Sequence, residues 1–85
     1  MQTYSYKPPF VNILHREVNK RVRYYSIRVY KTLFGEYLVE NSYGSLKNKR
    51  ATGVIQEYFQ TLDDALVASN KKVEQKLKKG YNRYE

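Results

Sequence analysis

The chain has 85 residues, a formal net charge of +8 and no cysteine, so it can form one small domain but neither a disulfide framework nor a thiolate metal site. Its single histidine, His15, argues against a clustered zinc site, and no apolar run reaches the roughly 20 residues of a membrane span. The N-terminus also lacks the apolar core of a signal peptide, which predicts a cytoplasmic protein, in a cell or a phage-infected cell, free to associate with the nucleoid.

The N-terminal part of the chain predicts a flexible segment followed by a strand. Residues 1–9 contain two prolines, which lack a backbone donor and favour extended geometry, so we expect a flexible lead-in there. The apolar, β-prone run 10–16 predicts a first strand, and Asn19 is a typical turn residue within the connection 17–21.

Residues 23–30 have the most regular β pattern in the chain. Their two faces are Tyr25, Ile27 and Val29 on one side, and Tyr24, Ser26, Arg28 and Tyr30 on the other. This period of two is typical of a half-buried antiparallel strand. Arg28 lies between two tyrosines, an arrangement found on sheets that bind nucleic acid, although an arginine there can equally keep an outer face soluble.

A turn, a strand and a basic loop follow. Gly35 can adopt positive φ and predicts a turn over 31–35, after which residues 36–42 are expected to run back as a strand. The alternation in that strand is not clean, so its buried face stays unassigned. Gly44 is expected to end the strand, and residues 47–50 then form an exposed basic loop.

A further strand and a long helix complete the chain. Residues 52–59 predict the strand, in which Gly53 marks a bulge or a close backbone approach. Thr61 with Asp64 three residues on resembles a capping box, and Gly80 is expected just beyond the end of a helix of about 18 residues. The expected buried stripe is Leu62, Ala65, Leu66, Ser69, Val73 and Leu77.

The short connections between the strands allow only antiparallel neighbours, because parallel neighbours need a long crossover. The helix then has one sheet face on which to bury its apolar stripe. The sequence therefore predicts an α+β fold, with an antiparallel β-sheet of about four strands and one C-terminal α-helix packed on one face.

The charge is unevenly distributed along the chain. Residues 1–34 contain seven Lys or Arg against one acid, residues 35–70 three against five, and residues 71–85 six against two. A basic surplus toward both ends of the chain favours a polyanionic partner, because clustered cations raise the local affinity for phosphate. The alternative is that the surplus serves solubility alone.

A series of short motifs occurs along the chain in a recognisable order. They are Arg23-Tyr24-Tyr25, Leu33-Phe34-Gly35, Tyr37-Leu38-Val39, Tyr43-Gly44-Ser45, Lys47 to Arg50, Phe59-Gln60-Thr61 and Lys78-Lys79-Gly80-Tyr81. In this order and spacing the chain resembles the WGR domain, named for a Trp-Gly-Arg tripeptide. The resemblance covers residues 10–82 as the domain and leaves 83–85 as a C-terminal tail. Tyr43 and Ser45 stand where the family signature has Trp and Arg.

The resemblance implies a small module that binds nucleic acid. In the poly(ADP-ribose) polymerases a WGR domain helps to bind broken DNA, and its tryptophan packs on a terminal nucleotide. Tyr43 retains a flat π-face that can stack on a base or a sugar, whereas Ser45 has no guanidinium group for phosphate. The alternative for Tyr43 is a strand-end tyrosine that packs across the helix.

The binding residues expected from the charge pattern and the resemblance combine one aromatic side chain with cations. They are Tyr43, Gly44, Lys47, Lys49, Arg50, Lys20, Arg21, Arg23 and Arg28. We expect DNA, or RNA, as the partner, with DNA ends or single-stranded segments preferred. The alternative is a protein-interaction or homodimerisation module that has lost the DNA-binding signature.

Catalytic motifs are missing from the sequence. It contains no Ser-His-Asp set, no phosphate-cradling glycine loop and no HExxH. We therefore expect a non-catalytic module without a cofactor, a bound metal, a small-molecule substrate or a membrane contact.

Overall fold

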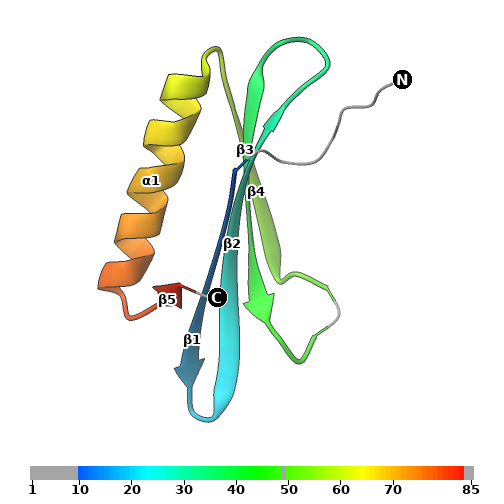
Figure 1. Ribbon diagram of the computed structural model, residues 1–85. Helices are drawn as coiled ribbons and strands as arrows, with labels where there is room; N and C mark the ends of the chain where they lie inside the picture. The colour runs from blue at the N-terminus through cyan, green and yellow to red at the C-terminus, as the bar shows by residue number, and fades with distance from the viewer. Residues whose placement is uncertain (1–9, 49, 84–85) are drawn as a thin grey trace.

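In the computed structural model, which describes residues 10–48 and 50–83, a five-stranded antiparallel sheet carries one helix on one face (Figure 1). The elements are β1 (Phe10–Val18), β2 (Arg21–Lys31), β3 (Tyr37–Ser45), β4 (Gly53–Phe59), α1 (Leu62–Lys78) and β5 (Asn82–Arg83). The order across the sheet is β4-β3-β2-β1-β5. The predicted α+β fold is confirmed, and the two-residue strand β5 joins the four main strands. The predicted lead-in 1–9, the predicted contact residue Lys49 and residues 84–85 lie outside the described residues.

Two tight turns explain why the strands pair antiparallel. Asn19 and Lys20 connect β1 to β2 with positive φ of 53° and 66°, the geometry of a two-residue turn whose twist matches that of the strands. Both strands therefore run up to this turn, which makes the connection shorter than the predicted 17–21. Gly35 takes a φ of 87° in the β2–β3 turn, where the amide of Thr32 donates to the carbonyl of Glu36 at 2.8 Å.

The third strand is longer than the sequence predicts, because β3 continues through Gly44 to Ser45. Gly44 pairs with Tyr24, and Ser45 pairs with Arg23. The prediction that Gly44 ends the strand is therefore wrong. The tripeptide Tyr43-Gly44-Ser45 is the last part of a paired strand, and its side chains alternate between the two faces of the sheet.

The core lies between one face of the sheet and α1. Its buried apolar residues are Leu14, Tyr25, Ile27, Val29, Val39, Ala65 and Val73. Because Val39 pairs with Val29, the helix-facing set of β3 is Tyr37, Val39, Asn41 and Tyr43, which the sequence left unassigned. Neither length nor hydropathy would allow a helix in the described part of the chain to cross a membrane.

Both ends of α1 follow the predicted signals. The Thr61 hydroxyl accepts a hydrogen bond from the amide of Asp64 at 3.1 Å, and Gly80 takes a φ of 102° just beyond the helix. The predicted buried stripe needs one correction, since Leu77 is 36% exposed. Lys76 is turned toward the sheet instead, and its ammonium group lies over the ring of Tyr25.

Asn41 is a polar residue in the core whose side chain is not fully hydrogen-bonded. It is 3% exposed, and its carbonyl oxygen Oδ1 has no hydrogen-bond partner among the described residues. A buried acceptor without a donor costs roughly 1–3 kcal/mol. We therefore expect Asn41→Val to raise the free energy of unfolding by about 1–2 kcal/mol in urea denaturation. Asn41→Asp, which buries a charge at the same place, should lower it, and a loss of stability in the valine variant would contradict this assignment.

Candidate nucleic-acid interface

Two chain reversals meet at one end of the sheet. The β1–β2 turn and the β3–β4 loop both lie toward the end at which α1 finishes (Figure 1). The amide of Leu46 donates to the carbonyl of Val22 at 3.0 Å, which ties the start of the loop to β2. We name this region the basic end, and its described members from the predicted set are Lys20, Arg21, Arg23, Lys47 and Arg50. The structure thus places five of the predicted contact residues at one end of the sheet.

The strand register separates the other predicted residues between two faces. Tyr25 pairs with Tyr43, so Tyr43 and Arg23 project from the face that carries α1. Gly44 and Arg28 belong to the opposite face. A ligand held against Tyr43 therefore cannot contact Arg28 without passing around the sheet.

Tyr43 packs at the edge of the core and is half-buried. Its ring lies nearly parallel to that of Tyr25, with the centroids 5.8 Å apart and an interplanar angle of 9°. The far side of the ring crosses Gly53 on β4, where a Cβ atom would collide with the ring and the hydroxyl group of Tyr43. Gly53 is thus a site of close approach, and the approaching group is a side chain. Arg23 of the basic end pairs with Ser45, two residues beyond Tyr43 on the same face of the sheet.

Gly44 has a positioning role in this arrangement. A Cβ atom at this position would lie 2.9 Å from the amide nitrogen of Thr52 and 3.4 Å from Cε2 of Tyr24. The same amide donates to the carbonyl of Tyr43 at 2.7 Å, which closes the β3–β4 loop onto the strand. The missing side chain of Gly44 therefore allows the loop to return close to β3 and determines where Lys47 and Arg50 are held.

Arg16, Lys76 and Tyr81, which are not among the predicted contact residues, lie on the helix side of the basic end. The Lys76 ammonium lies 4.4 Å from the ring centroid of Tyr25, and the Arg16 guanidinium lies 6.0 Å from that of Tyr81. Arg16 also pairs directly with Arg23 across the β1–β2 ladder. Like charges in directly opposed positions destabilise a sheet, so this pair marks a surface that an anion would stabilise. The sequence does contain a pointer to Arg16: it lies two residues after Leu14 in a predicted strand, so the two side chains share a face of the sheet.

The electrostatics of this region also favour an anionic ligand. Burial lowers the pKa of Lys76, and repulsion from Lys79 and Lys72 lowers this pKa further. Burial raises the pKa of Tyr25, with smaller contributions from Tyr43 and Tyr81. A depressed lysine pKa caused in part by other lysines reports a positive potential, which a bound phosphate would offset.

The raised pKa of Tyr25 makes stability depend on alkaline pH. The unfolded chain releases this proton near 10.0, whereas the folded protein retains it to higher pH. The stabilising contribution is therefore complete below pH 10.0 and is lost as the pH rises through the folded pKa. We expect the urea midpoint to fall above this value and to fall less steeply in Tyr25→Phe. The lowered pKa of Lys76 makes stability increase as the pH rises toward 10.5 and does not account for a loss at alkaline pH. An unchanged dependence of the urea midpoint on pH in Tyr25→Phe would contradict the assignment to Tyr25.

Comparison with known proteins gives one match. The family profile of the WGR domain matches residues 12–85, which is nearly the whole chain. Comparison with curated proteins found no match, and comparison with solved structures found none either. The matched region begins within β1 and includes the other four strands, the helix and the altered signature Tyr43-Gly44-Ser45. The resemblance seen in the sequence is confirmed, and the chain belongs to the WGR domain family.

Proposed function

We propose that this WGR domain binds DNA through its basic end, with a preference for ends or single-stranded segments, and that it has no catalytic activity of its own. WGR domains are nucleic-acid-binding modules. The observation that carries the proposal is the convergence of cations from two separate chain reversals at one end of the sheet. Glu17 is the only acid in β1, β2 and the turn between them, and the β3–β4 loop contains none.

The exposed cations of the basic end would bind phosphate groups of the DNA backbone. Lys20, Arg21 and Lys47 are exposed, so they can reach phosphate oxygens without disturbing the core. Arg16 and Arg23 lie opposite each other in β1 and β2, on the sheet face that carries α1. A phosphate between them would relieve their mutual repulsion.

Tyr43 provides the contact that distinguishes an end from continuous duplex. Its ring is held between Tyr25 and Gly53 of β4, so little conformational entropy is lost when a ligand packs against its exposed edge. We propose that a terminal base or sugar packs on the exposed part of this ring, next to the cations that hold its phosphate.

A titration followed by NMR tests the proposal. We expect a short duplex to shift the backbone amides of residues 19–23 and 46–52 at low salt, with smaller changes at the helix C-terminus. The amides of the β2–β3 turn, at the opposite end of the sheet, serve as the internal reference. An absence of shifts at low salt, or shifts restricted to the β2–β3 turn, would rule the basic end out as the DNA-binding surface.

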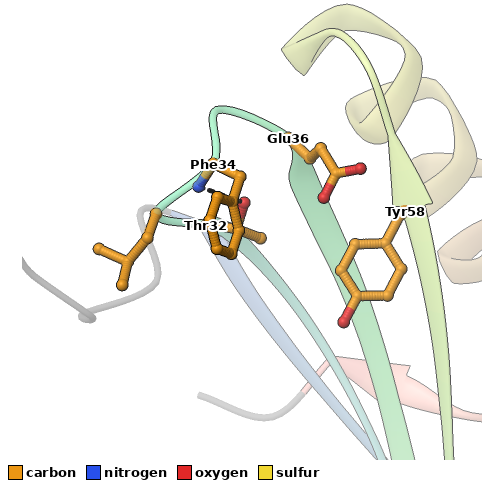
Figure 2. Close-up of a pocket in the computed structure, with 5 residues that line it drawn as sticks. Thr32, Phe34, Glu36 and Tyr58 are labelled. Atoms are coloured by element: carbon orange, nitrogen blue, oxygen red, sulfur yellow. Dashed lines mark hydrogen bonds between the residues drawn. The ribbon is translucent and has the colours of Figure 1, made fainter.

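A second candidate function, protein contact, is favoured by the β2–β3 turn. Leu33 and Phe34 at its tip are 75% and 90% exposed. The turn itself is built by Thr32 and Gly35, and the amide of Phe34 donates to the Thr32 hydroxyl at 3.2 Å (Figure 2). The two apolar side chains are therefore not needed for the turn geometry. Adjacent large apolar groups exposed in this way are characteristic of a contact surface.

The turn and β4 together form an open pocket of about 570 Å³. Its lining residues are Thr32, Leu33, Phe34, Glu36 and Tyr58. In Figure 2, Glu36 and Tyr58 lie across the pocket from the turn tip. Asp63 and Asp64 at the start of α1 lie toward the same end of the molecule (Figure 1). Glu36, Asp63 and Asp64 outnumber the exposed Lys31 at this end of the molecule, so it is apolar with a net negative charge and complements the basic end with its exposed Leu46.

For this second candidate we infer head-to-tail association, with the tip of one copy against the basic end of another. Sedimentation velocity over a range of concentrations should show reversible self-association that Phe34→Ser abolishes. Because the same basic end is covered in both complexes, DNA should dissociate the oligomer. A protein that stays monomeric at every concentration would reject this candidate and leave the DNA-binding proposal unaffected.

A further inference from the structure

The face of the sheet opposite α1 carries a pocket of its own. No helix covers this face within the described part of the chain (Figure 1). An open depression of about 250 Å³ lies on it, lined by Ile13, Tyr24, Ser26, Arg28, Ser42 and Leu46. The register explains its origin, because Ser26 pairs with both Ile13 and Ser42 in one row across three strands. Two small serine side chains lie side by side and are surrounded by larger ones.

The floor of this pocket contains an unsatisfied polar group. Ser26 is 4% exposed, and its Oγ has no hydrogen-bond partner among the described residues. This oxygen is enclosed by its neighbours, so a ligand atom reaches it only when a side chain lining the pocket shifts, and the hydrogen bond formed then removes the cost of the unsatisfied hydroxyl. The neighbouring hydroxyl of Ser42 lines the same pocket and adds a second hydrogen-bonding group.

One wall of the pocket is formed by the cation Arg28. Arg28 lies directly opposite Glu40 in the β2–β3 ladder. The carboxylate of Glu40 is engaged elsewhere, since it accepts hydrogen bonds from the Tyr30 hydroxyl at 3.2 Å and the Gln56 amide at 2.9 Å. Among the described residues the guanidinium group of Arg28 makes no hydrogen bond or ion pair, so its donors can bind an anion at the rim of the pocket, while the charge of Glu40 on the next strand partly offsets the positive potential there.

The other walls are flat or apolar. Tyr24 presents an aromatic ring, and Ile13 and Leu46 are 38% and 60% exposed. The pocket thus combines a ring for stacking, two aliphatic walls, two hydroxyls and one guanidinium. A planar heterocycle with an attached phosphate matches all of these groups at once.

We propose that this pocket binds one unpaired nucleotide of a strand whose adjoining part is held at the basic end. The base packs against Tyr24, Ser42 contacts its edge, and Arg28 contacts its phosphate. The Ser26 hydroxyl joins these contacts when the side chains above it shift. This inference rests on the proposed function and adds a second subsite to it. The connection is short, because Tyr24 follows Arg23 in β2 and Leu46 precedes Lys47 in the loop. Arg23 and Arg28 are about 16 Å apart along β2 and project from opposite faces, so the strand passes around the basic end to reach the pocket, a path that a few nucleotides can cover.

A peptide with a carboxylate and an apolar side chain is the competing ligand for such a pocket. The charge of the surroundings favours the nucleotide. The chain carries a net charge of +8, and the pocket opens next to the cations of the basic end, so a polyanion is attracted along its whole path. An isolated carboxylate would gain only the contact with Arg28.

The test compares two fluorescent duplexes of identical sequence, one blunt and one with a short single-stranded overhang, in anisotropy titrations. We expect the overhang to tighten binding by roughly tenfold in the natural protein. Tyr24→Leu should remove most of this gain without changing the affinity for the blunt duplex, and Ser26→Ala should reduce it in the same way. Arg28→Gln should also remove most of the gain, and because it removes one positive charge it should slightly weaken binding of the blunt duplex as well. Ser26→Ala deletes an unpartnered hydroxyl, so it should fold as well as the natural protein. Tyr58→Leu, on the same face but outside the pocket, is the matched control and should leave the gain intact.

Each outcome of this experiment has a separate meaning. Equal binding of the two duplexes, or variants without effect on the difference, would overturn the pocket proposal and leave the basic end as the DNA site. Failure of both duplexes to bind would overturn the proposed function together with the subsite. A short peptide that shifts the amides of Ser26 and Ser42 in NMR spectra, where the overhang does not, would also overturn the nucleotide assignment in favour of protein docking.

Discussion

Raising the salt concentration from about 50 mM to about 200 mM is expected to weaken the binding of duplex DNA by roughly 500-fold. If the five described cations of the basic end each neutralise one phosphate, the slope of log K against log salt is about −4.5. The effect is large because counterion release supplies most of the affinity of such an interface. Fluorescence anisotropy with a labelled duplex at four or more salt concentrations measures the slope directly.

Removal of individual cations provides the stronger form of this test. The double substitution Lys47→Gln with Arg50→Gln should make the slope shallower by about two, since each lost phosphate contact removes nearly one unit. Lys31→Gln is the matched control, because Lys31 is an exposed cation of β2 at the opposite end of the sheet. A titration that does not depend on salt, or a double variant with the slope of the natural protein, would remove the basic end from consideration.

The stacking contact can be separated from the charges by the same measurement. Tyr43→Ala should lower the affinity by about 1–3 kcal/mol without changing the slope, because it removes a π-face and no charge. Tyr43→Phe keeps the ring and should bind nearly as well as the natural protein. A changed oligomeric state in Tyr43→Ala, with no effect on DNA binding, would favour the protein-contact function instead.

The second large effect is expected at Gly53, where a side chain cannot coexist with the ring of Tyr43. Gly53→Val should lower the free energy of unfolding by about 2–3 kcal/mol, because the ring must leave its position against Tyr25. In a Tyr43→Ala background the same substitution removes a flexible residue from a strand and should be neutral or stabilising by up to about 1 kcal/mol. The coupling energy between the two sites is therefore about 3 kcal/mol.

Urea denaturation of the four proteins of this double-mutant cycle measures the coupling. Tyr43→Phe provides the control background, since the ring remains and Gly53→Val should still destabilise it. Additive effects of the two substitutions would show that the Tyr43 ring does not depend on the glycine, and the position of Tyr43 would then need to be revised.

The fold was predictable where the physical signal was local. The alternation of residues 23–30 identified β2 and its buried face without any knowledge of its neighbours. Thr61 and Gly80 marked the helix ends, because capping depends on a few consecutive residues and their backbone geometry. Gly35 and Asn19 marked the two turns for the same reason.

The candidate site was predictable only in part, because its arrangement depends on pairing between distant strands. The parity of β2 already separates Arg23 from Arg28, since residues five apart in a strand face opposite sides. The side occupied by Tyr43 could not be read in this way, because it depends on the register that places Tyr43 opposite Tyr25. The same limit concealed the Arg16–Arg23 pair and the inward turn of Lys76 at the end of α1.

The sequence by itself determined the α+β architecture and the strong basic surplus, because periodicity, capping and composition are properties of short segments, and its motifs in their order resembled the WGR family. Only the tertiary structure decided what the signature tripeptide does. Gly44 does not end a strand; its missing side chain admits the backbone of Thr52, a contact between residues eight apart that no local propensity encodes. Tyr43 is held by Tyr25 and by the absence of a side chain at Gly53, so its position follows from the packing of three strands.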